Sequence, residues 1–383
     1  MKLLLDISAV QAPLSGIGRY SCELAAHLPR VEGIDSVLFV RGTGVDAHFD
    51  PAQLPRQRRD GGLRRWLKRL PGLRRGLSTY RRLKAGRVAE SLDRFADHVY
   101  LSPNFSIPRF KGRSVATIHD LSVFRYPEFH PRDRVEHLQA EIRYSLANAN
   151  HLLTDSHSVR DELLARFHLE PGRVSVAPLG VDSAYRPRPA HELRAPLAAH
   201  GLQAGRYVLT VGTIEPRKNL DALLDAHARL DAGLRRQYPL VIVGAYGWSS
   251  RAVLDRIRAA PAGEVIYLDY VPESELPLII GGAAMFCCAS HYEGFGLPVL
   301  EAFSSGVPVV CADNSALSEL AGGCALMWPG GDPESLAGLI ARALEDGEWR
   351  ERAVADGLAR SGQYRWRNTA EAVAEALRGM VDR

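Results

Sequence analysis

A chain of 383 residues exceeds what one hydrophobic core usually organises, and its 46% hydrophobic and 24% charged residues are typical of a soluble globular protein with two domains. No apolar run approaches the roughly 20 residues that cross a bilayer, and charge interrupts the N-terminus too early for a secretory signal. These features exclude a membrane-spanning or secreted class, and we expect the protein in the cytoplasm.

The first half of the sequence alternates short apolar strands with helical segments, which predicts a mostly parallel sheet. The expected strands are 3–7, 37–40, 99–101, 114–118, 152–154 and 174–177. After the first strand, Ser15-Gly-Ile-Gly-Arg-Tyr20 forms a glycine turn that opens a helix, and Gly16 and Gly18 would let a bulky ligand approach the backbone closely. A helix-opening turn without a ligand explains the same pattern equally well.

Positive charge is concentrated between Arg56 and Arg87, where thirteen Lys or Arg stand against the single acid Asp60, although the whole chain carries only +4. Apolar residues recur among these cations at spacings of three or four, which is typical of an amphipathic helix lying on an anionic membrane surface. Nucleic-acid binding and a solvated insertion are the alternatives. We favour attachment to the inner face of the plasma membrane and expect no nucleic-acid partner.

Titratable groups follow two strands of the first half. The strand 114–118 ends in His119 and Asp120, and the strand 152–154 runs into Asp155-Ser-His-Ser-Val159. A histidine beside an acid can be a general base, or a satisfied histidine with a local partner. The serines of the second segment suit helix caps.

Prolines in Tyr185-Arg-Pro-Arg-Pro189 predict a hinge, and a second alternating series follows it. Its expected strands are 207–211, 240–243, 265–268, 285–288 and 307–310, and its helices include 219–230 and 334–344. We therefore expect two Rossmann-like domains, 1–185 and 186–366, that face each other across a cleft. A last helix, 368–381, has one apolar face.

The strand 207–211 ends in Gly212-Thr-Ile-Glu-Pro-Arg-Lys-Asn219, which places Arg217 and Lys218 at the carboxyl edge of the sheet. Two cations there suit a diphosphate, because fixed positive charge stabilises the negative charge that develops on a leaving phosphate. A surface charge pair is the alternative. An Asp-x-Asp pair, which could hold a divalent metal against a diphosphate, is absent from the sequence, so no metal and no other cofactor is expected.

The segment His291-Tyr-Glu-Gly-Phe-Gly-Leu-Pro-Val-Leu-Glu301 carries two carboxylates around a glycine-bounded loop that runs into a helix. Pro298 suits the first helical turn, and the N–H groups that open the helix suit a phosphate or sugar oxygen. Glu293 and Glu301 could each reach a different part of one ligand. Taken separately, they could be a solvated loop residue and a partner of the helix dipole.

This segment resembles the E-x7-E signature of the retaining glycosyltransferases of family 4, and the likeness covers nearly the whole chain apart from the basic segment. The resemblance implies the GT-B fold, an α/β architecture of two Rossmann-like domains facing across a cleft. In that fold the N-terminal domain, here 1–185, binds the acceptor, and the C-terminal domain, here 186–366, binds the nucleotide-sugar donor. The last helix, within 367–383, would return to the N-terminal domain.

The resemblance also assigns roles. Glu293 would contact the hydroxyls of the donor sugar, Glu301 would contact the ribose, and Arg217 and Lys218 would hold the diphosphate. His119 would position the sugar, because in this family the leaving phosphate helps to take the acceptor proton. The predicted catalytic residues are thus Glu293, Arg217, Lys218 and His119, and the predicted donor contacts are Glu301, Gly16, Gly18, Asp120, Gly294, Phe295, Gly296 and Leu297.

The segments 117–122 and 212–219 most resemble those of α-mannosyltransferases that use GDP-mannose in the assembly of bacterial surface polysaccharides, such as lipopolysaccharide or exopolysaccharide. The resemblance implies metal-independent, front-face transfer of mannose to a lipid-linked or growing polysaccharide acceptor. A UDP-hexose or dTDP-rhamnose donor is the alternative. A non-catalytic two-domain protein that binds a sugar or nucleotide is a rival from another class.

Overall fold

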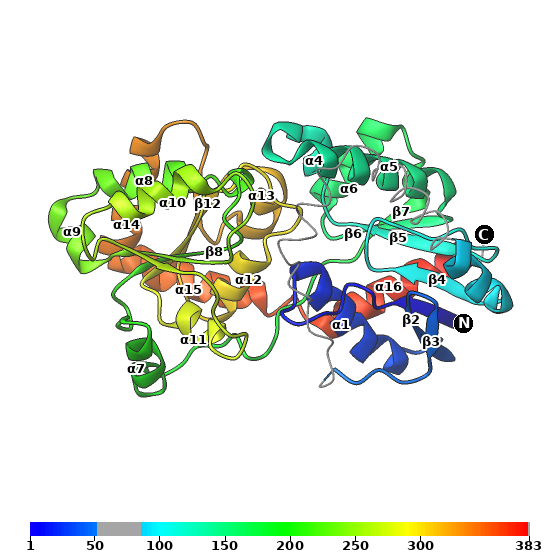
Figure 1. Ribbon diagram of the computed structural model, residues 1–383. Helices are drawn as coiled ribbons and strands as arrows, with labels where there is room; N and C mark the ends of the chain where they lie inside the picture. Colours follow the sequence, from blue (N-terminus) through cyan, green and yellow to red (C-terminus); the bar gives the residue numbers. More distant parts are fainter. Residues whose placement is uncertain (52–85, 382–383) are drawn as a thin grey trace.

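The computed structural model describes residues 1–51 and 86–381, which form two α/β lobes, each built on its own sheet (Figure 1). The predicted membrane segment, Arg56 to Arg87, lies almost entirely outside the described residues. In the part of the chain that is described, no helix is long and apolar enough to cross a membrane.

The N-terminal sheet has seven strands in the order β3-β2-β1-β4-β5-β6-β7, and only β3 runs antiparallel to its neighbour. The strands are β1 (Lys2–Asp6), β2 (Ser36–Arg41), β3 (Gly44–Asp46), β4 (Val99–Ser102), β5 (Ser114–Ile118), β6 (His151–Thr154) and β7 (Val174–Val176). The main helices are α1 (Gly16–His27), α4 (Ser122–Arg125), α5 (Arg132–Asn148) and α6 (His157–Phe167). The inner strands β4, β5 and β6 are buried along their whole length, as expected for parallel strands covered on both faces.

The C-terminal sheet has six strands in the order β10-β9-β8-β11-β12-β13, and every pair is parallel. They are β8 (Val208–Val211), β9 (Leu240–Val243), β10 (Val265–Leu268), β11 (Met285–Cys288), β12 (Val309–Ala312) and β13 (Leu326–Trp328). The helices are α7 (Ala190–Ala199), α8 (Leu220–Arg229), α9 (Ala232–Gln237), α10 (Arg251–Ala259), α11 (Leu276–Gly281), α12 (Leu297–Ser304), α13 (Ser315–Ala321), α14 (Pro333–Glu345) and α15 (Gly347–Ser361). The order reverses between β8 and β11, which is where open α/β sheets bind ligands.

The predicted strands are confirmed to within one residue at either end, with one exception. The strand expected at 307–310 begins at Val309 instead, because Pro308 has no N–H to give to the ladder. The helix expected from 219 begins at Leu220, since Asn219 is left-handed with φ of 52°. The strands β3 and β13 were not predicted, and each has only three residues at a sheet edge.

The last helix, α16 (Trp366–Val381), leaves the C-terminal lobe and packs on the N-terminal one, as predicted (Figure 1). Thr369 donates a hydrogen bond from its hydroxyl to the carbonyl of Pro178 at 2.7 Å, and Arg378 Nη1 donates to the carbonyl of Glu32 at 2.7 Å. A Cβ at position 180 would lie 2.1 Å from the backbone nitrogen of Trp366, so this crossing requires Gly180. The chain therefore passes between the lobes twice.

Candidate functional site

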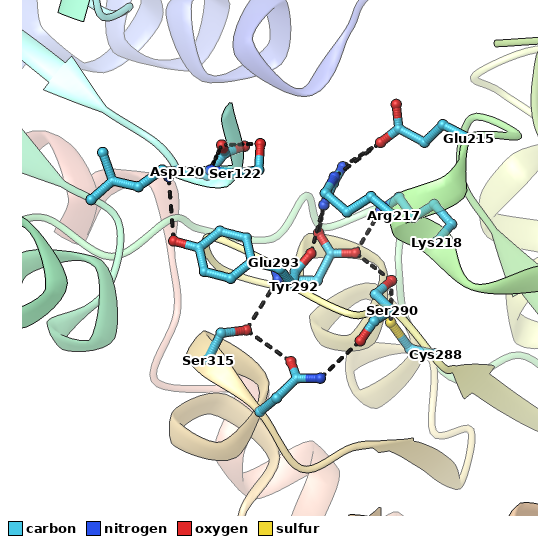
Figure 2. A network of polar contacts seen from close by, with 12 residues as sticks. Asp120, Ser122, Glu215, Arg217, Lys218, Cys288, Ser290, Tyr292, Glu293 and Ser315 are labelled. Atoms are coloured by element: carbon cyan, nitrogen blue, oxygen red, sulfur yellow. Dashed lines mark hydrogen bonds and ion pairs between the residues drawn. The ribbon is translucent and has the colours of Figure 1, made fainter. Parts of the chain in front are cut away.

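The side chains of Arg217, Lys218 and Glu293 meet at the cleft and form what we call the ion cluster (Figure 2). Arg217 Nη1 lies 2.9 Å from Glu293 Oε2, and Lys218 Nζ lies 2.6 Å from Glu293 Oε1. Ser290 donates a further hydrogen bond from its hydroxyl to Glu293 Oε1 at 2.7 Å. The fold brings these residues together because β8, which precedes the cations, and β11, which precedes the carboxylate, are neighbouring strands.

The ion cluster is mostly shielded from solvent, with 13%, 15% and 10% of the side chains of Arg217, Lys218 and Glu293 exposed. Burial alone raises the pKa of Glu293, but the charges of Lys218 and Arg217 outweigh it and lower the pKa to about 2. Burial alone lowers the pKa of Arg217, but Glu293 and two other acids outweigh it and raise the pKa. Glu293 is therefore an ionised carboxylate near neutral pH and can only accept hydrogen bonds.

Local structure fixes the turn that presents the two cations. Residues 216–218 form a short 3-10 turn, and the left-handed Asn219 ends it before α8 begins. Glu215 Oε1 accepts a charged hydrogen bond from Arg217 Nη2 at 2.7 Å. The guanidinium is thus held between two carboxylates, one from its own turn and one from the loop after β11.

The loop between β11 and α12, residues 289–296, packs against the N-terminal domain. A Cβ at Gly294 would lie 1.9 Å from the carbonyl oxygen of His119, so only glycine fits at this contact. Ser156 donates a hydrogen bond from its hydroxyl to the Gly294 carbonyl at 2.8 Å, and the Tyr292 hydroxyl accepts one from the backbone N–H of Leu121 at 3.3 Å. The structure therefore brings together the His119 segment and the Glu293 segment, which the sequence placed in different domains.

Both ring nitrogens of His119 face acceptors. Nδ1 lies 2.7 Å from Asp155 Oδ2, and Nε2 lies 3.0 Å from the carbonyl oxygen of Pro103. Because a carbonyl only accepts, Nε2 must carry a proton. Burial alone lowers the pKa of His119, but Asp155 outweighs it and raises the pKa. His119 thus has no free ring nitrogen to act as a general base.

A cavity of about 260 Å³ lies in the cleft, and its lining includes His119, Asp120 and Arg217. Asp120 Oδ1 accepts hydrogen bonds from the backbone N–H and the hydroxyl of Ser122, at 2.9 and 2.7 Å. This Asx-type turn fixes the carboxylate of Asp120 at the cavity wall.

The two glycines that open α1 differ in their surroundings. A Cβ at Gly16 would meet no atom within 4 Å, whereas a Cβ at Gly18 would lie 2.8 Å from the carbonyl oxygen of Ala9. Packing within the N-terminal domain therefore accounts for Gly18 without a ligand. Ile17, between them, lines the cleft cavity. Donor contact from either glycine stays a prediction.

The last residues of the loop shape the turn into α12. Phe295 is buried and packs edge to face against Tyr364, with ring centroids 5.8 Å apart. Gly296 precedes the helix with φ of 105°, a conformation that favours glycine, and Leu297 is the first helical residue. Contact of these residues with a donor stays a prediction.

Glu301 lies on the buried side of α12, where both domains and the hinge meet. Burial raises the pKa of Glu301 to about 7, although Arg19 on α1 and Tyr185 in the hinge lower it. Near neutral pH this carboxyl can therefore either donate or accept a hydrogen bond, and its contact with a ribose stays a prediction.

We expect Glu301 to make the protein less stable as the pH rises from about 4.5 to about 7. The unfolded chain releases this proton near the ordinary value of 4.5, whereas the folded protein keeps it until about 7, so the difference reaches about 3 kcal/mol above that window. Glu301→Gln keeps the shape of the side chain but cannot titrate, and should remove this contribution. Urea unfolding of both proteins at pH 5, 6 and 7.5 measures it, and parallel pH profiles would contradict the assignment.

Glu319 on α13 reaches across the cleft to the start of α6. Its Oε1 accepts from the backbone N–H of His157 at 3.1 Å, and its Oε2 accepts from that of Ser158 at 2.9 Å. Amides in the first turn of a helix lack intrahelical partners and favour negative charge. Ser315, on the same helix as Glu319, accepts from the backbone N–H of Glu293 at 3.1 Å. The helix α13 therefore links the ion cluster to the N-terminal domain.

The sequence did not identify four residues that hold this site together. Glu215 lies inside the segment 212–219 and Ser290 directly precedes the segment 291–301, so their closeness in sequence to Arg217 and Glu293 was the available signal. Ser315 and Glu319 carried no signal in the sequence, because their contacts form only when α13 packs against the loop of Glu293 and the start of α6. Within residues 1–51 and 86–381, no group of three or more His, Cys, Asp or Glu side chains is arranged to hold a metal ion.

Comparison with known proteins finds matches along both halves of the chain. A family model described as Glycosyltransferase Family 4 matches residues 14–185, and one described as Glycosyl transferases group 1 matches residues 199–359. The chain is 36% identical over 372 residues to the O-antigen chain mannosyltransferase B of Escherichia coli, with 96% of this chain and 97% of that protein covered. It is 32% identical over 245 residues to a D-inositol 3-phosphate glycosyltransferase of Acidothermus cellulolyticus, with 61% and 54% covered.

Solved structures share the fold at low sequence identity. The chain matches HepE of Anabaena, solved in complex with UDP-glucose, with a TM-score of 0.73, 16% identity and 99% of each chain covered. It matches WaaG, a glycosyltransferase involved in lipopolysaccharide biosynthesis, with a TM-score of 0.70, 15% identity, and 98% and 99% covered. Both likenesses extend over the two lobes and the cleft between them.

Proposed function

The chain belongs to the family 4 glycosyltransferases, and we propose that it transfers mannose from GDP-mannose, with retention of configuration, to a lipid-linked or growing polysaccharide acceptor. The observation that carries this proposal is the buried ion cluster of Arg217, Lys218 and Glu293 in the cleft of a two-domain GT-B chain. The mannosyl group and the surface polysaccharide are supported by the similarity to the O-antigen chain mannosyltransferase.

The ion cluster suggests how a donor would be received. In this structure Arg217 and Lys218 compensate the charge of Glu293, which would otherwise be costly to bury. A diphosphate carries more negative charge than one carboxylate, so it would draw both cations toward itself. Glu293 would then be free to accept hydrogen bonds from hydroxyls of the donor sugar. Donor binding and release of the carboxylate would be one event.

In the transfer step, the bond between the anomeric carbon and the diphosphate oxygen breaks while an acceptor oxygen bonds the same carbon on the same face. The acceptor proton passes to the leaving phosphate oxygen. Arg217 and Lys218 stabilise the charge on that phosphate, a role that other enzymes give to a metal ion. This route needs no protein base, which suits the engaged ring nitrogens of His119.

A screen of nucleotide sugars tests the proposal. We expect GDP-mannose to stabilise the protein against thermal unfolding more than UDP-glucose or dTDP-rhamnose does, because only a ligand that binds the folded state raises the melting temperature. Mannose should then pass from GDP-mannose to a bacterial lipid extract, at equal rates with and without EDTA. A larger shift with a UDP or dTDP sugar would favour the alternative donors. Tight binding without turnover of any donor would favour the non-catalytic binding protein.

We also propose that the basic segment 56–87 attaches the protein to the anionic inner face of the plasma membrane. The proposal rests on charge, since each of its thirteen cations near an anionic leaflet contributes about 1 kcal/mol. Replacing Arg74, Arg75, Arg81 and Arg82 by alanine should release the protein from phosphatidylglycerol vesicles at physiological salt. Equal sedimentation of the variant and the parent with these vesicles would refute the attachment.

A further inference from the structure

A second group of residues lines the 260 Å³ cavity and has no part in the proposed transfer step. His130 and Arg134 come from the N-terminal domain, just before and within the first turn of α5, and Trp248 comes from the C-terminal domain, after β9. The neighbouring apolar lining consists of Phe105, Val123, Leu138 and Ile142. This part of the wall therefore combines apolar side chains with the polar groups of His130 and Arg134.

The indole of Trp248 is fixed across the cleft. Its Nε1 donates a hydrogen bond to the carbonyl oxygen of Phe129 at 2.6 Å. The guanidinium of Arg134 lies 4.9 Å from the centroid of the indole, and the ring of His130 lies 5.6 Å from it. We call His130, Arg134 and Trp248 the Trp248 cluster. It forms only when the two domains are in contact.

The indole N–H of Trp248 is paired with Phe129, but the side chains of His130 and Arg134 have no hydrogen-bond partner within the described part of the chain. Both ring nitrogens of His130 are buried, and neither has a hydrogen-bond partner among the described residues. Arg134 is exposed and contacts the indole, but it forms no ion pair within the described part of the chain. Burial lowers the pKa of His130, so its neutral ring offers one donor and one acceptor. Buried polar groups of this kind are normally satisfied by a ligand or water.

We propose that the Trp248 cluster binds the terminal pyranose of the acceptor glycan, the sugar whose hydroxyl receives the transferred hexose. This inference rests on the proposed glycosyltransferase function and adds the residues that select the acceptor. A pyranose has an apolar face of C–H groups that suits an aromatic wall, and a rim of hydroxyls. The hydroxyls can pair with the imidazole of His130 and the guanidinium of Arg134.

The position of the cluster favours the acceptor over the donor. The donor's diphosphate is assigned to Arg217 and Lys218. These two residues follow β8, whereas Trp248 follows β9. His130, Asp120 and Arg217 line the same cavity, so a sugar beside His130 would lie next to the reacting centre. Its 260 Å³ is below the roughly 300–1,000 Å³ of sites for drug-sized ligands, a size that suits a single sugar unit.

The variants His130→Ala and Arg134→Ala test the assignment, with Arg132→Ala as a matched control. Arg132 is on the same helix as Arg134, but its side chain is 94% exposed and pairs with Glu136. The probes are radiolabelled GDP-mannose and a lipid extract of bacterial membranes, added in increasing amounts. We expect each test variant to need about tenfold more extract for half-maximal transfer, the effect of losing one hydrogen-bonded contact. The melting-temperature shift caused by GDP-mannose should stay that of the parent, and the control should match the parent in both measurements.

Each other result decides against the proposal. Parental half-saturation in both test variants would remove His130 and Arg134 from the acceptor site. A reduced shift with GDP-mannose would assign them to the donor instead. If the parent protein itself transferred no sugar from any of the screened donors, the proposed function would fail, and the acceptor site with it.

Discussion

Replacing Lys218 by alanine is expected to lower kcat/KM for the nucleotide sugar by about a hundredfold or more, the scale of losing a contact made to a developing charge. Lys218 Nζ lies 2.6 Å from Glu293 on one side of the ion cluster, and 15% of its side chain is exposed. It can therefore reach a ligand in the cleft without leaving the turn that follows β8. Its charge acts in a site from which solvent is largely excluded, where it is worth more than in water.

Stability should change much less than activity in this variant. Glu293 keeps its ion pair with Arg217 at 2.9 Å and its hydrogen bond from Ser290, so no buried charge is left alone. Steady-state kinetics and thermal unfolding, measured on the same preparation, separate the two effects. The control is Lys111→Ala, which removes an ion pair with Asp93 from a lysine whose side chain is 71% exposed, and should leave kcat/KM unchanged. Parental turnover in Lys218→Ala would remove this residue from the site.

Gly294→Ala should also reduce kcat/KM by about a hundredfold, because displacing reacting groups by roughly 1 Å is enough for a loss of that size. The added Cβ would lie 1.9 Å from the carbonyl oxygen of His119, an atom of the other domain. Two atoms cannot remain 1.9 Å apart without a bond, and a backbone carbonyl cannot turn aside as a flexible side chain can. Either the domains must separate or the loop that carries Glu293 must move. Either response separates the ion cluster from the His119 segment.

The clash at Gly294 is between domains, and the core of each domain keeps its packing. We therefore expect a melting temperature within a few degrees of the parent's. Small-angle scattering distinguishes the two responses, with a larger radius of gyration if the domains separate and an unchanged one if the loop moves. Gly338→Ala is the control, since a Cβ at this position in α14 meets no atom within 4 Å and alanine favours helix. Full activity in Gly294→Ala would mean that the contact with His119 is not needed for turnover.

The fold was largely predictable because strands buried on both faces appear as uninterrupted apolar runs. The tetrad Leu240–Val243 of β9 is an example, and it was located to the residue. Prediction failed where only hydrogen bonding decides the outcome. The three residues of β3 pair at the edge of the sheet with little burial, and Pro308 delays the start of β12 for lack of an N–H.

The site was predictable to the extent that its residues follow strands within one domain. Arg217 and Glu293 come after neighbouring strands, and motif resemblance placed both in the cleft before any contact was known. The partners that join the domains could not be predicted in the same way. The contact of Glu319 with the first turn of α6 and that of Trp248 with Phe129 depend on how two separately folded lobes are oriented.

The return of α16 to the N-terminal lobe has a consequence for dissecting the protein. Buried residues Trp366, Val373 and Leu377 belong to the same continuous core as β1 and α1, although they are last in the chain. An N-terminal fragment that ends at the hinge would lack α16 and would expose the apolar surface that this helix covers. A chimera that exchanges N-terminal domains between relatives therefore needs two junctions, one in the hinge 185–189 and one just before Trp366. With a single junction in the hinge, the N-terminal lobe would pack against a terminal helix that fits a different protein.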